Sequence, residues 1–391
     1  MMYPLQKLGD MCRISAGGTP LRTKLECFGG GIPWVKITDM IQGTVVSTDE
    51  TLTAQGIKNS SAKVLPIGTV LISIFATIGR TAVLGIEAAT NQAIAGVVPH
   101  NKDQLDPQFL RFYLDSQHGN LNREARGVAQ PNINQSILKN LEISVPPLTE
   151  QRRIVDLLSR AEGIVRLRRE AEKKAAELIP ALFLDLFGDP ATNQKGWSHH
   201  LFGEVGTLDR GRSRHRPRDA KELYDGPYPF IQTGDVANSG GRISSFTSTY
   251  SETGLAQSKL WPMGTLCITI AANIAKTGVL EFDACFPDSV VGFLPSGAVR
   301  TDYVQAWLGF LQPTIEANAP QAAQKNINLE ILRNLPISIP PISLQEIFEQ
   351  RCRDVVSIQS QQSAATAKAQ ATFDALLAQA FSANHAPQAQ L

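Results

Sequence analysis

Residues 68–84 read GTVLISIFATIGRTAVL, and residues 264–280 read GTLCITIAANIAKTGVL. Nine of the seventeen positions are identical, and the two stretches start 196 residues apart, half the length of the 391-residue chain. Short runs rich in Val, Ile and Thr between turn residues are typical of β-strands. The chain therefore carries the same group of predicted strands twice.

The match extends in the same order on both sides of these strands. IPWVKITDM at 32–40 corresponds to YPFIQTGDV at 228–236, and PNINQSILKNLEISVPPLTEQRRI at 131–154 corresponds to KNINLEILRNLPISIPPISLQEIF at 325–348. A period near 195 is far longer than the repeat of a solenoid, so the chain contains two homologous domains. Each domain mixes short strands with predicted helices such as 108–117 and 303–311, which indicates an α+β fold.

A long predicted helix follows each domain after a Pro-Pro pair. Thr149 is a predicted N-cap of the first helix, and its apolar seam, at alternating steps of three and four, includes Ile154, Leu157, Ile164, Leu178 and Leu182. The second helix, from Ser343, has a sparser seam of Phe348, Val355, Ile358 and Leu376. One helix cannot bury such a stripe alone, so the two are expected to form an antiparallel coiled coil with pseudo-two-fold symmetry.

These patterns predict five segments. They are a first domain at 1–148, a first helix at 149–188, a second domain at 189–342, a second helix at 343–383 and a disordered tail at 384–391. The formal net charge is +1, with 43% hydrophobic and 19% charged residues, so any nucleic-acid binding must depend on local basic patches. Five scattered cysteines, without metal-ligand spacing, and no signal or membrane segment indicate a cytoplasmic protein.

The sequence contains no phosphate-binding loop and no catalytic motif, so we expect neither a catalytic nor a metal site. The clearest chemical signal is DRGRSRHRPRD at 209–219, where every second residue is basic: Arg210, Arg212, Arg214, Arg216 and Arg218. In an extended segment these side chains would share one face, where they suit phosphates or guanine edges of DNA. The alternative is a solvated surface loop with ion pairs to Asp209, Asp219 and Glu222.

The corresponding loop of the first domain is ISAGGTPLRTK at 14–24. Close backbone approach to a phosphate is expected at Gly17, Gly18 and Thr19, with charge from Arg22 and Lys24; the alternative is an ordinary Gly-Pro turn. Other candidates for DNA contact are Lys36, Gln232 and Thr233, although each of them is also a plausible turn or cap residue. The basic pair Arg80 and Lys276, which occupies one position of the repeat, is a candidate phosphate contact.

Together, these motifs resemble the specificity subunit of type I restriction-modification systems. The resemblance rests on ISAGGTP, PWVKITDM, GTVLIS…TIG, VPPLTEQRRIV, FLDLFGDP and RGRSRHRP…YPFIQTGDV, and it covers almost the whole chain. It implies two target-recognition domains that each read half of a split site in double-stranded DNA. It further implies helices that set the spacing and bind two methyltransferase subunits, which carry S-adenosylmethionine and methylate adenine N6. The resemblance also implies that a motor-nuclease subunit can join to give a restriction form, and that the chain itself carries no cofactor and no catalytic site.

Two further interpretations stay open. One is a specificity subunit of a related bifunctional restriction-methylation enzyme or another defence complex, and the other is a scaffold that tethers partners through its coiled coil without binding DNA. A stand-alone enzyme would require methyl transfer by the purified chain, which we do not expect. The target sequence itself is not encoded in any motif, because base readout depends on loop geometry and DNA shape.

Overall fold

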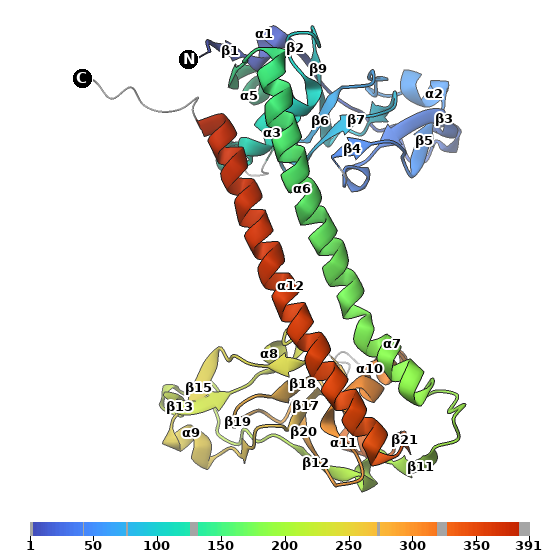
Figure 1. Ribbon diagram of the computed structural model, residues 1–391, viewed down its shortest axis with the longest axis vertical. Coiled ribbons are helices and arrows are strands. Elements are labelled where there is room, and N and C mark those ends of the chain that lie inside the picture. Colours follow the sequence, from blue (N-terminus) through green and yellow to red (C-terminus); the bar gives the residue numbers. More distant parts are fainter. Residues whose placement is uncertain are drawn as a thin grey trace, which may run out of the picture. The chain divides into compact units, whose positions relative to one another are not determined.

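A computed structural model describes residues 3–41, 43–75, 77–125, 132–271, 274–318 and 327–382. The chain divides into two compact units, one formed by residues up to Arg169 together with those from Ala364 onward, and one formed by Glu170–Ser363. Each unit is an α+β domain with segments of two long helices packed against it (Figure 1). The predicted disordered tail at 384–391 lies outside the described residues.

The first unit is built on a five-stranded sheet. Its strand order is β2 (Cys12–Ala16), β9 (Ile94–Pro99), β6 (Val70–Ser73), β7 (Thr81–Leu84) and β4 (Thr44–Val45). All neighbours are antiparallel except β4 and β7, which are parallel. A smaller sheet has the order β5 (Glu50–Leu52), β3 (Phe28–Val35) and β8 (Ala89–Thr90), and β1 (Leu5–Lys7) pairs with β10 (Glu142–Ser144).

Short helices complete the first domain: α1 (Leu8–Met11), α2 (Ala54–Lys58), α3 (Pro107–Ser116), α4 (His118–Ala125), α5 (Gln135–Asn140) and 3-10 turns at Leu25–Cys27 and Ile37–Asp39. The Asp106 carboxylate caps α3 by accepting from the N–H groups of Gln108 at 2.8 Å and Phe109 at 3.2 Å. Because α3 covers the sheet, Phe109, Phe112 and Leu110 are buried with Val70 and Ile72.

The second unit repeats this topology. Its five-stranded sheet has the order β12 (Gly206–Arg210), β20 (Val290–Pro295), β17 (Leu266–Thr269), β18 (Thr277–Leu280) and β14 (Arg242–Ile243). Its smaller sheet has the order β15 (Ser248–Tyr250), β13 (Tyr224–Phe230), β19 (Ala284–Cys285) and β16 (Leu260–Trp261), and β11 (Ser198–Leu201) pairs with β21 (Pro336–Ile339). The helical elements are α8 (Thr233–Ala237), α9 (Glu252–Ala256), α10 (Thr301–Asn318), α11 (Leu329–Arg333) and 3-10 turns at Phe202–Glu204 and Lys221–Leu223.

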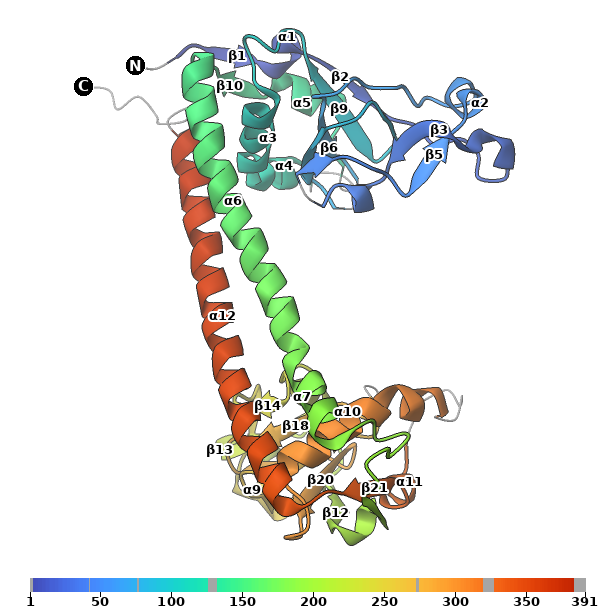
Figure 2. The same cartoon turned by 45° about the vertical axis from the view of Figure 1, so that its right-hand side comes forward.

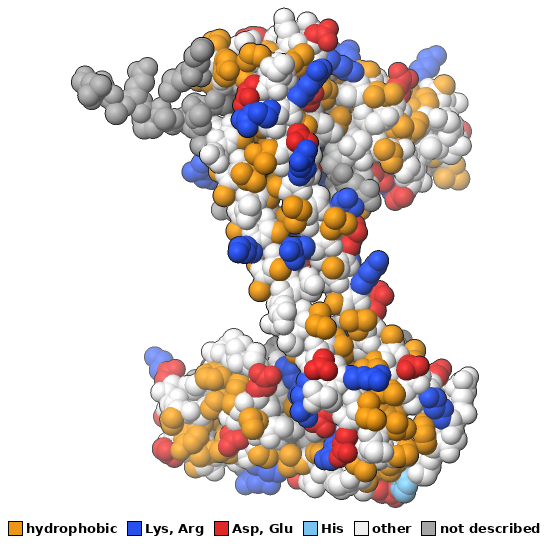
Figure 3. Space-filling model, viewed as in Figure 1, with side chains coloured by type: hydrophobic (Ala, Val, Ile, Leu, Met, Phe, Trp, Pro, Cys, Tyr) orange, Lys and Arg blue, Asp and Glu red, His pale blue; other side chains and the backbone are white. Residues whose placement is uncertain are grey.

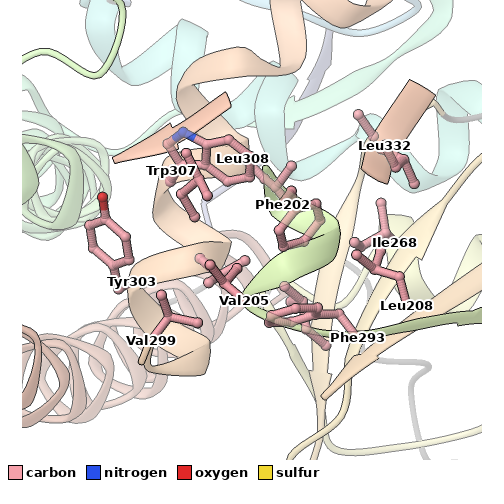
Figure 4. Close-up of a cluster of buried hydrophobic side chains, with 14 of the residues drawn as sticks. Phe202, Val205, Leu208, Ile268, Phe293, Val299, Tyr303, Trp307, Leu308 and Leu332 are labelled. Carbon is pink, nitrogen blue, oxygen red and sulfur yellow. The ribbon is translucent and has the colours of Figure 1, made fainter. Parts of the chain in front are cut away.

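The duplicated stretches at 68–84 and 264–280 form the same hairpin in the two units. Val70 pairs with Val83 in β6–β7, and the residues 196 positions later, Leu266 and Val279, pair in β17–β18. Both hairpins lie in buried sheets, and Figure 4 shows how Ile268 of β17 meets aromatic and aliphatic side chains of the second core. The predicted duplication of one α+β domain is confirmed.

The first long helix is interrupted close to Pro180, the residue at which the sequence predicts a kink. Helix α6 spans Leu148–Ala176 and α7 spans Leu178–Phe187. Pro180 has no N–H group for the carbonyl of Ala176, and the helix breaks one turn before it, at Glu177. Gly188, with φ of +79°, ends α7, close to the predicted end of the first helix at 188, and α12 spans Ile342–Ser382.

The two long helices pack together within each unit. In the first unit, Arg169 of α6 donates to the Gln370 side chain of α12 at 2.8 Å, and Figure 2 shows these helix segments side by side. In the second unit, Gln359 of α12 donates to the carbonyl of Ala175 at 2.8 Å. The helix ends also enter the cores: Phe381 of α12 packs on Phe109 in the first unit, and Phe183 of α7 packs on Tyr303 in the second.

The predicted seam of the first helix is wrong at three positions. Ile154 and Leu182 pack against the cores, but Leu157, Ile164 and Leu178 are about half exposed. The buried residues lie one position later, at Leu158 and Val165. On the second helix Phe348 is buried, Val355 and Leu376 are partly buried, and Ile358, also predicted in the seam, is exposed. Helix α6 therefore has two apolar stripes, and the one with Leu158 and Val165 faces inward.

A fully buried glutamine fastens the start of each long helix to its domain. The Gln151 side chain accepts from the Asp106 N–H at 2.8 Å and donates to the carbonyls of Gln104 at 2.7 Å and Pro146 at 2.8 Å. In the second unit, Gln345 accepts from the Arg300 N–H at 2.8 Å and donates to the carbonyls of Ala298 and Pro340. The repeated glutamine in TEQRR and SLQEI marks this position in the sequence, although neither glutamine was predicted to have this role.

Replacing Gln151 with alanine should destabilise the first unit by roughly 2–3 kcal/mol. The truncation leaves the buried carbonyl of Pro146 and two partly buried groups, the carbonyl of Gln104 and the N–H of Asp106, without partners. Each unsatisfied group costs about 1 kcal/mol. Urea denaturation followed by amide exchange at Asp106 measures the effect. The adjacent Glu150→Ala variant is the control, because Glu150 lies at the surface and pairs with the exposed Arg153. Equal stability of the two variants would contradict this role for Gln151.

Candidate nucleic-acid interface

The hairpin tips present one basic residue at the same place in both units. The Arg80 N–H donates to the Ser73 hydroxyl at 2.9 Å, and the Lys276 N–H donates to the Thr269 hydroxyl at 3.1 Å. Both side chains are exposed, and the Arg80 guanidinium also reaches the carbonyl of Ile37 at 3.3 Å. The local fold therefore places Arg80 and Lys276 equivalently, as the repeat predicted.

The two predicted phosphate-binding loops share their backbone geometry. The N–H groups of Gly17 and Gly18 donate to the carbonyls of Ile94 and Thr90, and those of Gly211 and Arg212 donate to the carbonyls of Val290 and Phe286. The accepting carbonyls of the two domains lie 196 residues apart in the sequence and the donating N–H groups lie 194 apart, so both loops leave the sheet along the same path. Arg212 thus stands where the first domain has Gly18.

The glycines of the first loop have a packing role that was not predicted. Gly17 and Gly18 are buried, and a Cβ atom would lie 2.2 Å from the Thr90 carbonyl oxygen at Gly17 and 2.4 Å from the Ala62 nitrogen at Gly18. They are needed for close packing inside the domain, and their contact with a phosphate stays a prediction. Thr19 donates its hydroxyl hydrogen to Gln92.

The arginine row is extended over only part of its length. From Arg210 to Arg214 exposed and buried residues alternate, with Gly211 and Ser213 buried, so Arg210, Arg212 and Arg214 point outward. A turn at 216–219 then ends the alternation. Arg216 folds back onto the carbonyls of Ser213 and His215, and Arg218 forms an ion pair with Asp288 at 2.9 Å. The predicted row of five is therefore a row of three.

Three basic candidates of the first domain lie near the loop that follows Gly18. Arg22 and Lys36 both bind the Glu50 carboxylate, at 2.6 Å and 2.9 Å, while Lys24 is exposed. Hydrogen bonds from Arg22, and then from Lys36, hold the pKa of Glu50 below its usual value. The Arg22 guanidinium also lies over the rings of Phe28 and Trp34, at 4.9 Å and 5.0 Å. Arg22 and Lys36 are therefore held in a fixed, partly neutralised cluster.

In the second unit the corresponding surface is a polar hollow of about 480 Å³. Gln232 lies at its edge and is exposed, and its N–H group donates to the Asp235 carboxylate at 2.8 Å, which starts α8. Thr233, the first residue of α8, is partly exposed. The hollow is also lined by residues that were not predicted, because they resemble ordinary loop residues: Asn238, Arg242, Ser244, Ser245 and Thr247. Amide and hydroxyl groups of this kind suit base edges.

A second polar hollow, of about 610 Å³, lies in the first unit between the β6–β7 hairpin and α6. In its wall the guanidinium of Arg111, whose side chain is 4% exposed, binds both carboxylate oxygens of Glu162 at 2.9 Å and 2.7 Å. It also contacts Asp115 at 3.5 Å, and Asp115 accepts from the Thr81 hydroxyl of β7. Burial raises the pKa of Asp115 to about 6, against the opposing effect of Arg111.

The raised pKa of Asp115 predicts that this residue stabilises the folded chain more at acidic pH than at neutral pH. Asp115 holds its proton more tightly in the folded chain than in the unfolded chain. Its protonation therefore adds to the free energy of unfolding fully below pH 4, and this stabilisation is lost as the pH rises through about 6. The difference in unfolding free energy between the wild type and Asp115→Asn should therefore change by about 2 kcal/mol between pH 4 and pH 7, with the wild type relatively more stable at pH 4. Urea denaturation of both proteins across this range measures it, and a pH-independent difference would contradict the shift.

The described residues hold no cluster of His, Cys, Asp and Glu that could bind a metal ion. Within the described ranges, no helix is long and apolar enough to cross a membrane.

Comparison with known families agrees with this duplicated architecture. A family model described as the type I restriction modification DNA specificity domain matches residues 5–177 and again residues 194–356. The chain belongs to this family. The resemblance stated from the sequence is thereby confirmed, and so is the α+β fold with two such domains and long helices packed together. The family is one of DNA specificity domains and not of catalytic domains.

The chain is also similar to curated proteins that are named as type I specificity subunits. The type I restriction enzyme MjaIX specificity subunit of Methanocaldococcus jannaschii is 24% identical over 254 residues, which are 59% of this chain and 57% of that protein. The EcoR124I/EcoR124II specificity subunit of Escherichia coli is 28% identical over 178 residues, which are 44% of each protein. The chain thus spans about half the length of these curated relatives.

Two solved structures share the fold along nearly the whole chain. A chain from a study of complex assembly and conformational transition in the type I R-M system has a TM-score of 0.63 and 22% identity, with 97% of both chains covered. The type I S subunit from M. genitalium has a TM-score of 0.54 and 15% identity, with 97% of this chain and 96% of that chain covered.

Proposed function

We propose that the chain is the DNA sequence-recognition subunit of a type I restriction-modification complex. Residues 1–148 and 189–342 would each act as a target-recognition domain that reads one half of a bipartite site in double-stranded DNA. The helices at 149–188 and 343–383 would set the distance between the half-sites. The complex would act in the cytoplasm.

One observation carries this proposal. The two domains keep the same strand order in their five-stranded sheets and the same loop backbone, but they present different side chains on it, with Gly18 in one and Arg212 in the other. A scaffold that is repeated while its surface chemistry changes is suited to reading two different sequences. Lys276 and Arg80, equivalent in position and both basic, are proposed as phosphate contacts common to the two readers.

The methyltransferase partners would dock on the exposed faces of the helices. In the first unit, Leu157, Ile164 and Leu167 of α6 are 45%, 52% and 58% exposed at heptad-like spacing, and Figure 3 shows hydrophobic side chains at the surface along these helices. Such an exposed apolar stripe supports a protein contact. In this proposal the chain carries no cofactor: the partners bring S-adenosylmethionine and methylate adenine N6, and a motor-nuclease subunit completes the restriction form.

Binding by the assembled complex tests the function. The complex with its methyltransferase subunits should bind a duplex that contains its recognition sequence about a thousandfold more tightly than a random duplex, at physiological salt. The recognition sequence is the one at which the complex methylates adenine. The chain alone should bind weakly and with strong salt dependence, because it would contribute only part of the phosphate contacts. If the complex binds both duplexes equally, sequence recognition is wrong, and the scaffold interpretation gains support.

A further inference from the structure

In the first unit, Arg111, Asp115, Glu162 and Thr81 form a cluster, called here the Arg111 cluster, that connects α3, α6 and β7. None of these four residues is among the proposed DNA contacts. Arg111 and Asp115 lie on α3, Glu162 lies on the long helix α6, and Thr81 begins strand β7 directly after Arg80. The bonds therefore form a continuous path from the long helix to the residue beside a proposed DNA contact. The Arg111 side chain is buried while that of Glu162 is 41% exposed, and their bidentate contact fixes both the distance and the angle between the two helices at this point.

The hairpin tip is supported from its other side as well. Gly79, with φ of +85°, lies so close to α4 that a Cβ atom would be 2.4 Å from Nδ1 of His118. The same hollow is lined by Arg80, His118, Arg111, Asp115, Glu162 and Arg169. The tip that carries Arg80 is thus held between close packing on α4 and the Thr81–Asp115 hydrogen bond.

The second unit lacks this cluster. Residues 194 positions later, at the corresponding places along α10 and α12, are Gln305 for Arg111, Gly309 for Asp115 and Val356 for Glu162. There Gln305 donates to the carbonyl of Gly241 at 2.8 Å, and Arg242 pairs with Asp302 inside the same domain. In the residues described for that unit, no such path of ion pairs joins Thr277 to the long helix.

We propose that the Arg111–Glu162 ion pair, with Asp115 and Thr81, is a positioning element that holds the β6–β7 hairpin in a fixed orientation to α6, so that it sets the reading of the first half-site only. This inference rests on the proposed function and adds a residue-level asymmetry between the two readers. Arg111 and Glu162 act through the hairpin and need not touch DNA.

Methylation maps of variants provide the test. We would express the complete complex with Glu162→Gln or Arg111→Gln in a host without other adenine methylation and map the methylated adenines across its genome. Both variants should relax base preference in one half of the motif, with discrimination there reduced about tenfold, which corresponds to the loss of roughly one base contact. The other half should stay unchanged. Glu162→Asp, which keeps the charge, should restore part of the lost discrimination.

Glu150→Gln is the matched control, because it removes the same charge from the same helix where the arginine partner is exposed. A purely structural role would lower the amount of active complex and leave the motif intact in every variant. An unchanged motif, or equal relaxation of both halves, would overturn the proposal. Absence of any motif in the wild type would instead reject the proposed function itself.

Discussion

The double substitution of Arg212 and Arg214 by alanine should weaken binding of the assembled complex to its site about 30-fold. Both side chains point outward from the extended loop that follows β12, and their guanidinium groups form no hydrogen bond or ion pair among the described residues. Loss of two charge-assisted contacts accounts for an effect of this order. If both contact phosphates, the slope of log affinity against log salt should fall by about 2.

The affected half of the site distinguishes this prediction from a general loss of charge. Discrimination against substitutions should fall in the second half-site and remain in the first. Arg216→Ala with Arg218→Ala removes the same charge from the same loop, but these two arginines already have partners in their own domain. We expect a loss of less than about threefold for this control. An equal loss at both half-sites would contradict the assignment of this loop to one reader.

Replacing Phe183 with alanine should destabilise the second unit by about 4 kcal/mol, within the usual range for a buried phenylalanine. Its ring is 1% exposed and lies 5.5 Å from the ring of Tyr303, 5.0 Å from that of Phe310 and 5.8 Å from that of Phe348. It therefore joins α7, α10 and α12 in one core. Amide exchange in α10 should accelerate strongly, while exchange in α3 of the first unit should change little.

Leu184→Ala is the control for this substitution. Leu184 follows Phe183 on the same helix but is exposed, so the truncation should cost less than about 1 kcal/mol. Similar destabilisation by the two variants would show that α7 does not pack on the second domain as described. Acceleration of exchange in both units would show that they unfold together.

The duplicated fold could be predicted from sequence because it depends on long matching blocks. Two matching stretches of seventeen residues, each at the same place in its half of the chain, indicate that the core strands are repeated. The order of all strands in the two five-stranded sheets agrees with that inference. The Asp106 cap of α3 and the Gly188 stop of α7 were also predictable, because they depend on local backbone chemistry.

The orientation of the first helix could not be predicted, because two apolar stripes overlap on it. Leu157 and Ile164 have the same spacing as Leu158 and Val165, and hydrophobic pattern alone does not decide which stripe meets the partner helix. The packing role of Gly17 and Gly18 could not be predicted for a related reason. A glycine pair permits close approach to any neighbour, and here the neighbours are Thr90 and Ala62 of the same domain.

The Arg111 cluster was not predicted at all. Its members lie on separate elements and carry no motif, and an arginine within an amphipathic helix usually faces solvent. Only the tertiary fold brings Arg111 of α3 against Glu162 of α6. The second unit has Gln305 and Val356 at the corresponding positions, so the repeat also gave no indication of this contact.

The most direct test of the central claim is a map of methylated adenines in a host that expresses this chain with its methyltransferase. We expect one motif with two specified parts separated by a spacer of fixed length without base preference, and Arg212→Ala with Arg214→Ala should relax only one of these parts. A single uninterrupted motif, or a motif that is the same when the chain is left out, would contradict a two-domain reader of a bipartite site.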